Sequence, residues 1–174
     1  FMAAVMTAAR TRRRVRLTAT HTAKGVVIGF NAWRSKFIVD LQECPVMKTD
    51  LFKLVSKLRE SLVMWLPHGE SCDIQLTSLL DGVDMLLIGG PPLGMDQRQT
   101  LAEMAAFLHI SRLSWKKWDR SPPEPIFQAV PLSVSFGKAR VPFPAGAFLQ
   151  ATQAGEEALV DFAKSVCKTG ARVL

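Results

Sequence analysis

Apolar and polar residues alternate one by one in residues 12–20, with the period that a half-buried β-strand produces. The apolar members of this pattern are Val15, Leu17 and Ala19, and the polar members are Arg14, Arg16 and Thr18. The turn-forming segment HTAKG and the apolar segment VVIGF follow, so residues 12–30 predict a β-hairpin with a cationic outer face. A third short strand is predicted at residues 37–41, ahead of a turn fixed by Pro45.

Apolar residues with the spacing of an amphipathic helix occupy residues 49–65, and Pro67 and Gly69 mark the end of this helix. Two apolar segments then flank the dipeptide Asp81-Gly82, which is typical of tight β-hairpins. A second helix is predicted at residues 96–109, where apolar residues again share one face.

Further strands are predicted at residues 112–118, 126–136 and 139–143, with the Pro-rich segment RSPPEP as a surface loop before the second of them. The elements therefore follow the order strands, helix, hairpin, helix, strands. This order is typical of an α+β domain in which an antiparallel sheet packs against two helices.

An amide side chain, Gln150, closes the apolar segment VPFPAGAFL directly before a predicted helix at residues 152–168. Two interpretations are open: the amide satisfies backbone groups at a loop junction, or it is a binding group at the mouth of a site. Gly170 ends the helix, and the segment ARVL then predicts the start of a buried strand. We therefore expect the chain to be a fragment. The predicted apolar stripe of the helix consists of Leu159, Phe162, Ala163 and Val166.

The net charge of +7 is concentrated at one end of the chain. Residues 1–39 hold eight Lys or Arg and no acidic residue, whereas the remaining 135 residues hold 14 basic and 15 acidic side chains, a net of −1. A cationic strand on a neutral body favours contact with a polyanion such as nucleic acid. The alternative is an exposed edge strand whose charges prevent aggregation.

Cysteine and histidine spacing excludes several kinds of site. Cys44, Cys72 and Cys167 lie far apart, which argues against a secreted disulfide framework and favours a reducing compartment. The three histidines have no zinc-site spacing, and neither a glycine-rich phosphate loop nor a GxSxG motif occurs. No apolar run approaches the roughly 20 residues of a membrane-spanning helix. We expect a cytoplasmic monomer without membrane contact.

Four segments stand out by their order along the chain: RRRVRL, GVVIGFNAWRSKFIVDLQECPVM, FPAGAFLQATQAGEEALVDFA and ARVL. In this order they resemble the RNA 5-methyluridine methyltransferases, above all the branch that acts on large-subunit ribosomal RNA. The resemblance covers nearly the whole chain and is loose between residues 50 and 135. It implies an RNA-contacting central α+β domain at residues 1–146. Residues 147–174 would then be the first helix and the strand start of a Rossmann-like methyltransferase domain.

The resemblance implies transfer of a methyl group from S-adenosylmethionine to C5 of a uridine in RNA. The RNA would be 23S ribosomal RNA or, alternatively, transfer RNA. In this mechanism a cysteine thiolate adds to C6, C5 takes the methyl group, and a base removes the C5 proton. The family's SCNP segment, which carries the catalytic cysteine, has no counterpart here, and the segment around Cys72 does not match it. We therefore assign no catalytic residue and expect the chain alone to be inactive.

The same resemblance implies roles for two residues. Cys44, in QECPV, corresponds to the last of four cysteines that hold a [4Fe–4S] cluster in the ribosomal branch. The other three would precede this chain, and without the resemblance a buried, inert thiol is the simpler interpretation. Gln150, in FLQ, corresponds to a glutamine that contacts the methyl donor or lies beside the target base. Thr152 replaces the family's usual Asn but still offers a helix-capping side chain.

Arg12, Arg14 and Arg16 are the residues that we expect to face RNA, with Trp33 nearby for stacking. Two other functions are open. The chain could be a stand-alone RNA-binding module without catalysis, or a protein-interaction domain whose basic strand only protects a sheet edge.

Overall fold

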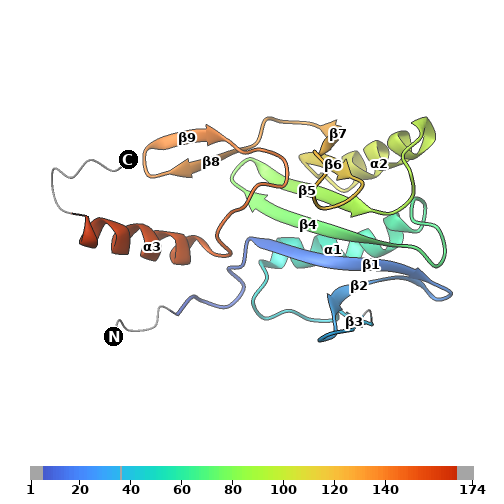
Figure 1. Ribbon diagram of the computed structural model, residues 1–174, viewed down its shortest axis with the longest axis horizontal. Coiled ribbons are helices and arrows are strands. Elements are labelled where there is room, and N and C mark those ends of the chain that lie inside the picture. Colours follow the sequence, from blue (N-terminus) through green and yellow to red (C-terminus); the bar gives the residue numbers. More distant parts are fainter. Residues whose placement is uncertain (1–5, 36, 168–174) are drawn as a thin grey trace.

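A seven-stranded sheet with the order β3-β2-β1-β4-β5-β6-β7 runs through the protein (Figure 1). The structure is a computed structural model, and it describes residues 6–35 and 37–167. The strands are β1 (Arg14–Thr22), β2 (Gly25–Asn31), β3 (Ile38–Asp40), β4 (Ser71–Leu79), β5 (Gly82–Gly89), β6 (Arg112–Lys116) and β7 (Glu124–Gln128).

The predicted α+β fold class is confirmed, and so are both predicted hairpins. β1 pairs with β2, and β4 pairs with β5 across the Asp81-Gly82 turn, where Gly82 has a φ of 131°. One parallel pair, β5 with β6, interrupts the otherwise antiparallel order. A parallel connection needs a crossover segment, and helix α2 (Met95–Phe107) provides it.

Helices α1 (Thr49–Leu62) and α2 cover one face of the sheet with their apolar sides. The alternation predicted for β1 is confirmed, because Val15, Leu17 and Ala19 are buried against these helices. The largest side chains buried in this core include Leu17, Ile28, Leu51, Leu58, Leu62, Ile74, Leu76, Met85, Leu87 and Leu101.

The chain after β6 differs from the prediction. β7 includes Pro125, which the sequence placed in a loop; an edge strand tolerates proline because its outer side needs no N–H donor. The single strand predicted at residues 126–136 is wrong. It is interrupted around Pro131, which has no N–H to continue the ladder. β8 (Ser133–Phe136) and β9 (Ala139–Pro142) instead form a separate two-stranded sheet.

Helix α3 (Gln153–Val166) lies beside the β8–β9 hairpin, at one end of the large sheet (Figure 1). Thr152 caps it as predicted, since its hydroxyl accepts a hydrogen bond from the Gly155 N–H at 3.1 Å. The predicted apolar stripe is present but faces solvent, and no residue of α3 is buried. Lys168, Gly170 and the predicted strand ARVL lie outside the described residues. Among the described residues, no helix combines the length and apolar character needed to cross a bilayer.

Candidate nucleic-acid interface

The sheet face opposite α1 and α2 carries Arg14 and Arg16, two of the predicted RNA-facing arginines, and we call it the polar face. Strand register places Arg14 opposite Thr77, Arg16 opposite Gln75 and Thr18 opposite Asp73. Because side chains alternate between the two faces of a strand, the same register continues this face across β5 and β6. Its further members are Asp84, Leu86, Ile88, Arg112, Ser114 and Lys116.

The Arg16 guanidinium binds two carboxylates on the polar face. Its Nη2 lies 2.6 Å from Asp73 Oδ2, and its Nη1 lies 2.8 Å from Asp119 Oδ1. The hydrogen bond with Asp119 raises the pKa of Arg16 above its ordinary value, and the same contact lowers the pKa of the Asp119 carboxyl. Acids from β4 and from the loop after β6 therefore neutralise part of the cationic strand. A phosphate bound to Arg16 would compete with these two carboxylates.

Arg14 and Arg12 lie in different environments from Arg16. The Arg14 Nη2 donates to Gln75 Oε1 at 3.0 Å, and its guanidinium stacks over the Phe148 ring, 5.2 Å from the centroid. Burial lowers the pKa of Arg14, and repulsion from Arg16 adds to this. Arg12 is half-buried and joins a parallel backbone bridge to Met47. Contact of these three arginines with RNA stays a prediction.

The segment at residues 143–150, which we call the junction loop, is fastened over the polar face by buried polar side chains. Gly146 donates its N–H to Asp84 Oδ2 at 3.2 Å, and its carbonyl accepts from Gln75 Nε2 at 3.1 Å. Arg112 bridges the same region, since it bonds Asp84 at 2.7 Å and the Phe143 carbonyl at 2.8 Å. The loop that ends in Gln150 is therefore held by the sheet itself.

Gln150 lies half-buried where the junction loop meets α3. Its backbone carbonyl accepts a hydrogen bond from Arg13 Nε at 3.2 Å. Its side-chain amide takes part in none of the hydrogen bonds found among the described residues, so it does not satisfy the loop backbone there. A role for Gln150 in binding the methyl donor stays a prediction.

Arg13 holds this junction together, and the sequence did not reveal it. Its N–H donates to the Ala151 carbonyl at 2.7 Å, and its Nη2 forms a salt bridge with Glu156 Oε2 at 2.7 Å. Both side chains of this salt bridge are largely buried. The sequence did contain one indication of this role. Arg13 lies two residues before Val15 and four before Leu17, so its side chain is expected on the same, core-facing side of the strand, where a solvated cation is not expected.

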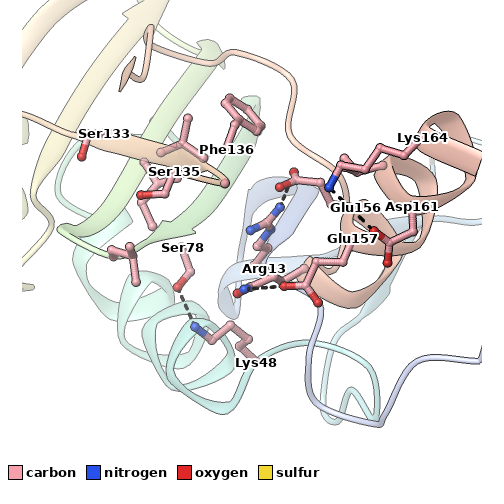
Figure 2. Close-up of a pocket in the computed structure, with 16 residues that line it drawn as sticks. Arg13, Lys48, Ser78, Ser133, Ser135, Phe136, Glu156, Glu157, Asp161 and Lys164 are labelled. Atoms are coloured by element: carbon pink, nitrogen blue, oxygen red, sulfur yellow. Dashed lines mark hydrogen bonds and ion pairs between the residues drawn. The ribbon is translucent and has the colours of Figure 1, made fainter. Parts of the chain in front are cut away.

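A groove of about 700 Å³ separates α3 from the β8–β9 turn and the start of α1 (Figure 2). Within this groove, Lys48 Nζ donates a hydrogen bond to the Ser78 hydroxyl at 3.1 Å. Three cationic and three acidic side chains line the groove, so its charge favours neither an anion nor a cation. These are Arg13, Lys48, Lys164, Glu156, Glu157 and Asp161.

All three cysteines are free thiols in the fold. Cys44 is half-buried against the main core, Cys72 is buried in β4, and Cys167 is exposed at the end of α3. Burial raises the pKa of the Cys72 thiol to about 12, which keeps it protonated and unreactive. The described residues contain no group of three or more potential metal ligands. They do not by themselves fit an iron–sulfur cluster, and ligation by Cys44 stays a prediction.

Comparisons with known proteins link the chain to RNA-modifying enzymes. It is 34% identical over 153 residues to an uncharacterized RNA methyltransferase of Zymomonas mobilis, covering 88% of this chain and 38% of that protein. It is 38% identical over 79 residues to a 23S rRNA (uracil(1939)-C(5))-methyltransferase of Nitrosospira multiformis, covering 44% of this chain and 18% of that protein. No family model matches the chain.

A solved structure shares the fold. It is a Pyrococcus abyssi tRNA (uracil-54, C5)-methyltransferase in complex with S-adenosyl-L-homocysteine. It superposes with a TM-score of 0.60 at 13% identity, covering 93% of this chain and 42% of that one. The chain thus spans less than half the length of the relatives it matches. The resemblance of this chain to the RNA methyltransferases is confirmed over the part of those proteins that it matches.

Proposed function

We propose that this chain is the RNA-contacting part of an enzyme that methylates C5 of a uridine in RNA, with S-adenosylmethionine as the donor. The observation that carries the proposal is the similarity of most of the chain to RNA methyltransferases. The relative named for C5 of uracil in 23S ribosomal RNA supports ribosomal RNA as the substrate. Transfer RNA is the second candidate, because the solved structure that shares the fold is named for it.

The proposed reaction is covalent. A cysteine thiolate outside this chain adds to C6 of uracil, and C5 then attacks the methyl carbon of the sulfonium donor, releasing S-adenosylhomocysteine. A base removes the C5 proton, and the electrons of that C–H bond restore the C5–C6 double bond as the thiolate leaves. A paired or stacked uridine has to leave its stack before the thiolate can reach C6.

In this proposal the chain binds RNA and orients the methyl donor or the target base, and it contributes no reacting group. Residues 1–146 would contact RNA, and residues 147–174 would begin the methyltransferase domain. Gln150 would present its amide to the donor or to the target base, on a loop that Arg13 and Asp84 hold in place. Holding that amide on a fastened loop lowers the entropy lost when the ligand binds.

The test is a methyl-transfer assay with the product of the whole reading frame around this chain. We expect transfer of labelled methyl from S-adenosylmethionine to a 23S ribosomal RNA transcript, with 5-methyluridine in the digest. RNA carrying 5-fluorouridine should form a stable adduct with the protein, since fluorine at C5 cannot leave as a proton. Methylation at another atom, or of no RNA, would overturn the proposal. A transfer RNA transcript tests the alternative, and the 174-residue chain alone should transfer no methyl group.

A triple substitution tests the predicted RNA-facing arginines. Replacing Arg12, Arg14 and Arg16 by alanine should weaken RNA binding and lower the salt dependence of log Kd by about 2, at roughly 0.7 per lost phosphate contact on a single strand. The measurement is RNA binding by fluorescence anisotropy over a series of salt concentrations.

The matched control removes three exposed cations elsewhere, with Lys53, Lys57 and Lys138 replaced by alanine. It changes the net charge equally but should leave most of the salt slope in place. Equal effects of the two triple variants would show that only net charge matters. They would then exclude a specific role for the strand.

A further inference from the structure

The turn between β2 and β3 presents an exposed aromatic surface, of which the sequence predicted only Trp33 as a residue for stacking. Trp33 is 84% exposed, Phe37 is 70% exposed and Phe30 is 41% exposed. Phe30 pairs across the strands with Val39, which is also exposed, and Phe37 shares the face of Val39 because it lies two residues away. We call Phe30, Trp33 and Phe37 the aromatic tip.

Backbone hydrogen bonds hold the aromatic tip in a defined shape. Ala32 donates its N–H to the Phe37 carbonyl at 2.8 Å, and Ser35 donates its N–H to the Ala32 carbonyl at 3.0 Å. The Phe37 N–H is bonded to the Ser35 hydroxyl at 3.0 Å. These bonds restrict the backbone of Ala32, Ser35 and Phe37, which reduces the conformational entropy lost when a ligand binds.

The charge around the aromatic tip favours an anion. The Arg34 guanidinium lies over the Trp33 ring, 4.4 Å from the centroid, and Arg34 forms none of the salt bridges found in the described part of the chain. The nearby acid of β3, Asp40, is engaged by Arg59 and Gln42. Arg34 therefore keeps a positive charge beside the ring, in contrast to Arg16, whose charge two carboxylates balance.

We propose that the aromatic tip stacks on unpaired bases of an RNA strand while Arg34 contacts its phosphates. The inference rests on the proposed RNA-binding function and assigns part of it to residues outside the arginine strand. An aromatic face suits any base, and an adjacent cation suits the phosphate backbone, which is how proteins bind single-stranded nucleic acid. An apolar partner surface would match the rings but would leave the Arg34 charge without a counterpart.

Trp33 itself supplies the signal for the test. Trp65 and Trp115 are buried, so added RNA should quench chiefly Trp33 and Trp118. In a Trp118→Phe background, titration of the chain with a single-stranded RNA dodecamer should give a saturable loss of emission. Trp33→Ala, followed by anisotropy of labelled RNA, should weaken binding about tenfold, within the range for one stacked base. Trp33→Phe should stay within about threefold, because an aromatic face remains.

Two controls separate stacking from charge and from general apolar contact. An abasic dodecamer carries the same phosphates without bases, and it should bind about equally well to the original chain and to Trp33→Ala. Phe107→Ala removes a similarly exposed aromatic side chain on α2 and should leave RNA affinity unchanged.

The outcomes distinguish this inference from the proposed function. The stacking inference is overturned if Trp33→Ala does not weaken RNA binding, or if it weakens binding of abasic RNA equally. Neither result bears on the proposed methyl transfer, which the methyl-transfer assay tests separately. Self-association lost in Trp33→Ala, seen by light scattering without any effect on RNA, would make the aromatic tip a contact between copies and also overturn it. A chain that binds no single-stranded RNA overturns it as well.

Discussion

Replacing Asp84 by alanine is expected to lower the free energy of unfolding by about 3–5 kcal/mol, because it leaves a buried arginine without its counter-ion. The Asp84 side chain is 1% exposed and that of Arg112 is 11% exposed, and their atoms approach to 2.7 Å. Asp84 also accepts the N–H of Gly146, so its loss frees one anchor of the junction loop. The measurement is urea denaturation followed by tryptophan fluorescence.

Matched variants separate burial from charge. Glu124→Ala removes the acid of an exposed salt bridge with Arg98 and should cost less than about 1 kcal/mol. Changing Arg112 to methionine together with Asp84→Ala should recover part of the loss, since no unpaired charge then remains buried. If Asp84→Ala proves too unstable to purify, Asp84→Asn keeps the shape and allows the measurement. A cost for Asp84→Ala no larger than that for Glu124→Ala would contradict this account of the junction loop.

Replacing Gly29 by alanine is expected to cost about 3 kcal/mol, the upper part of the usual range for overpacking, and to detach β3 from the sheet. A Cβ atom at Gly29 would lie 1.8 Å from the carbonyl oxygen of Val39, which is backbone and cannot rotate away. The hydrogen bond from the Leu41 N–H to the Ile28 carbonyl, now 2.9 Å, should open. Faster hydrogen exchange of the Leu41 amide reports this directly.

The matched control is Gly137→Ala, at the β8–β9 turn. Gly137 has a φ of 60°, and a Cβ there would meet nothing within 4 Å. Gly137→Ala should therefore lower the free energy of unfolding only by the roughly 1–2 kcal/mol that a left-handed backbone costs a residue with a Cβ. It should leave hydrogen exchange of the Leu41 amide unchanged. Since β3 supports the aromatic tip, Gly29→Ala should also weaken RNA binding. Unchanged Leu41 exchange in Gly29→Ala would refute the close approach of β2 and β3.

Local patterns in the sequence predicted most elements, because each pattern reports a property of a short segment. The period-two alternation at Val15 and Leu17 identified the buried side of β1, and Asp81-Gly82 identified the tight hairpin. The capping role of Thr152 was also readable, since a cap involves only neighbours in the chain. The family resemblance, which depends on the order of segments, was confirmed by the comparisons.

Contacts between segments that lie far apart in the chain could not be predicted from the sequence. Arg16 looked like a free cation, but Asp73 and Asp119 lie 57 and 103 positions away along the chain and reach it only in the fold. Arg13 was hidden in a run of arginines, and its salt bridge to Glu156 spans 143 positions. The parallel pairing of β5 with β6 likewise depends on how α2 crosses between them.

The sequence by itself thus determined most of the strands and helices, which of their faces are apolar, and which family they resemble. The tertiary structure decided which charges stay free. It pairs Arg16 with carboxylates and leaves Arg34 over Trp33 without one among the described residues. The physical reason is that period and propensity act between neighbours in the chain, whereas a charge is balanced by whatever the fold brings within a few ångströms.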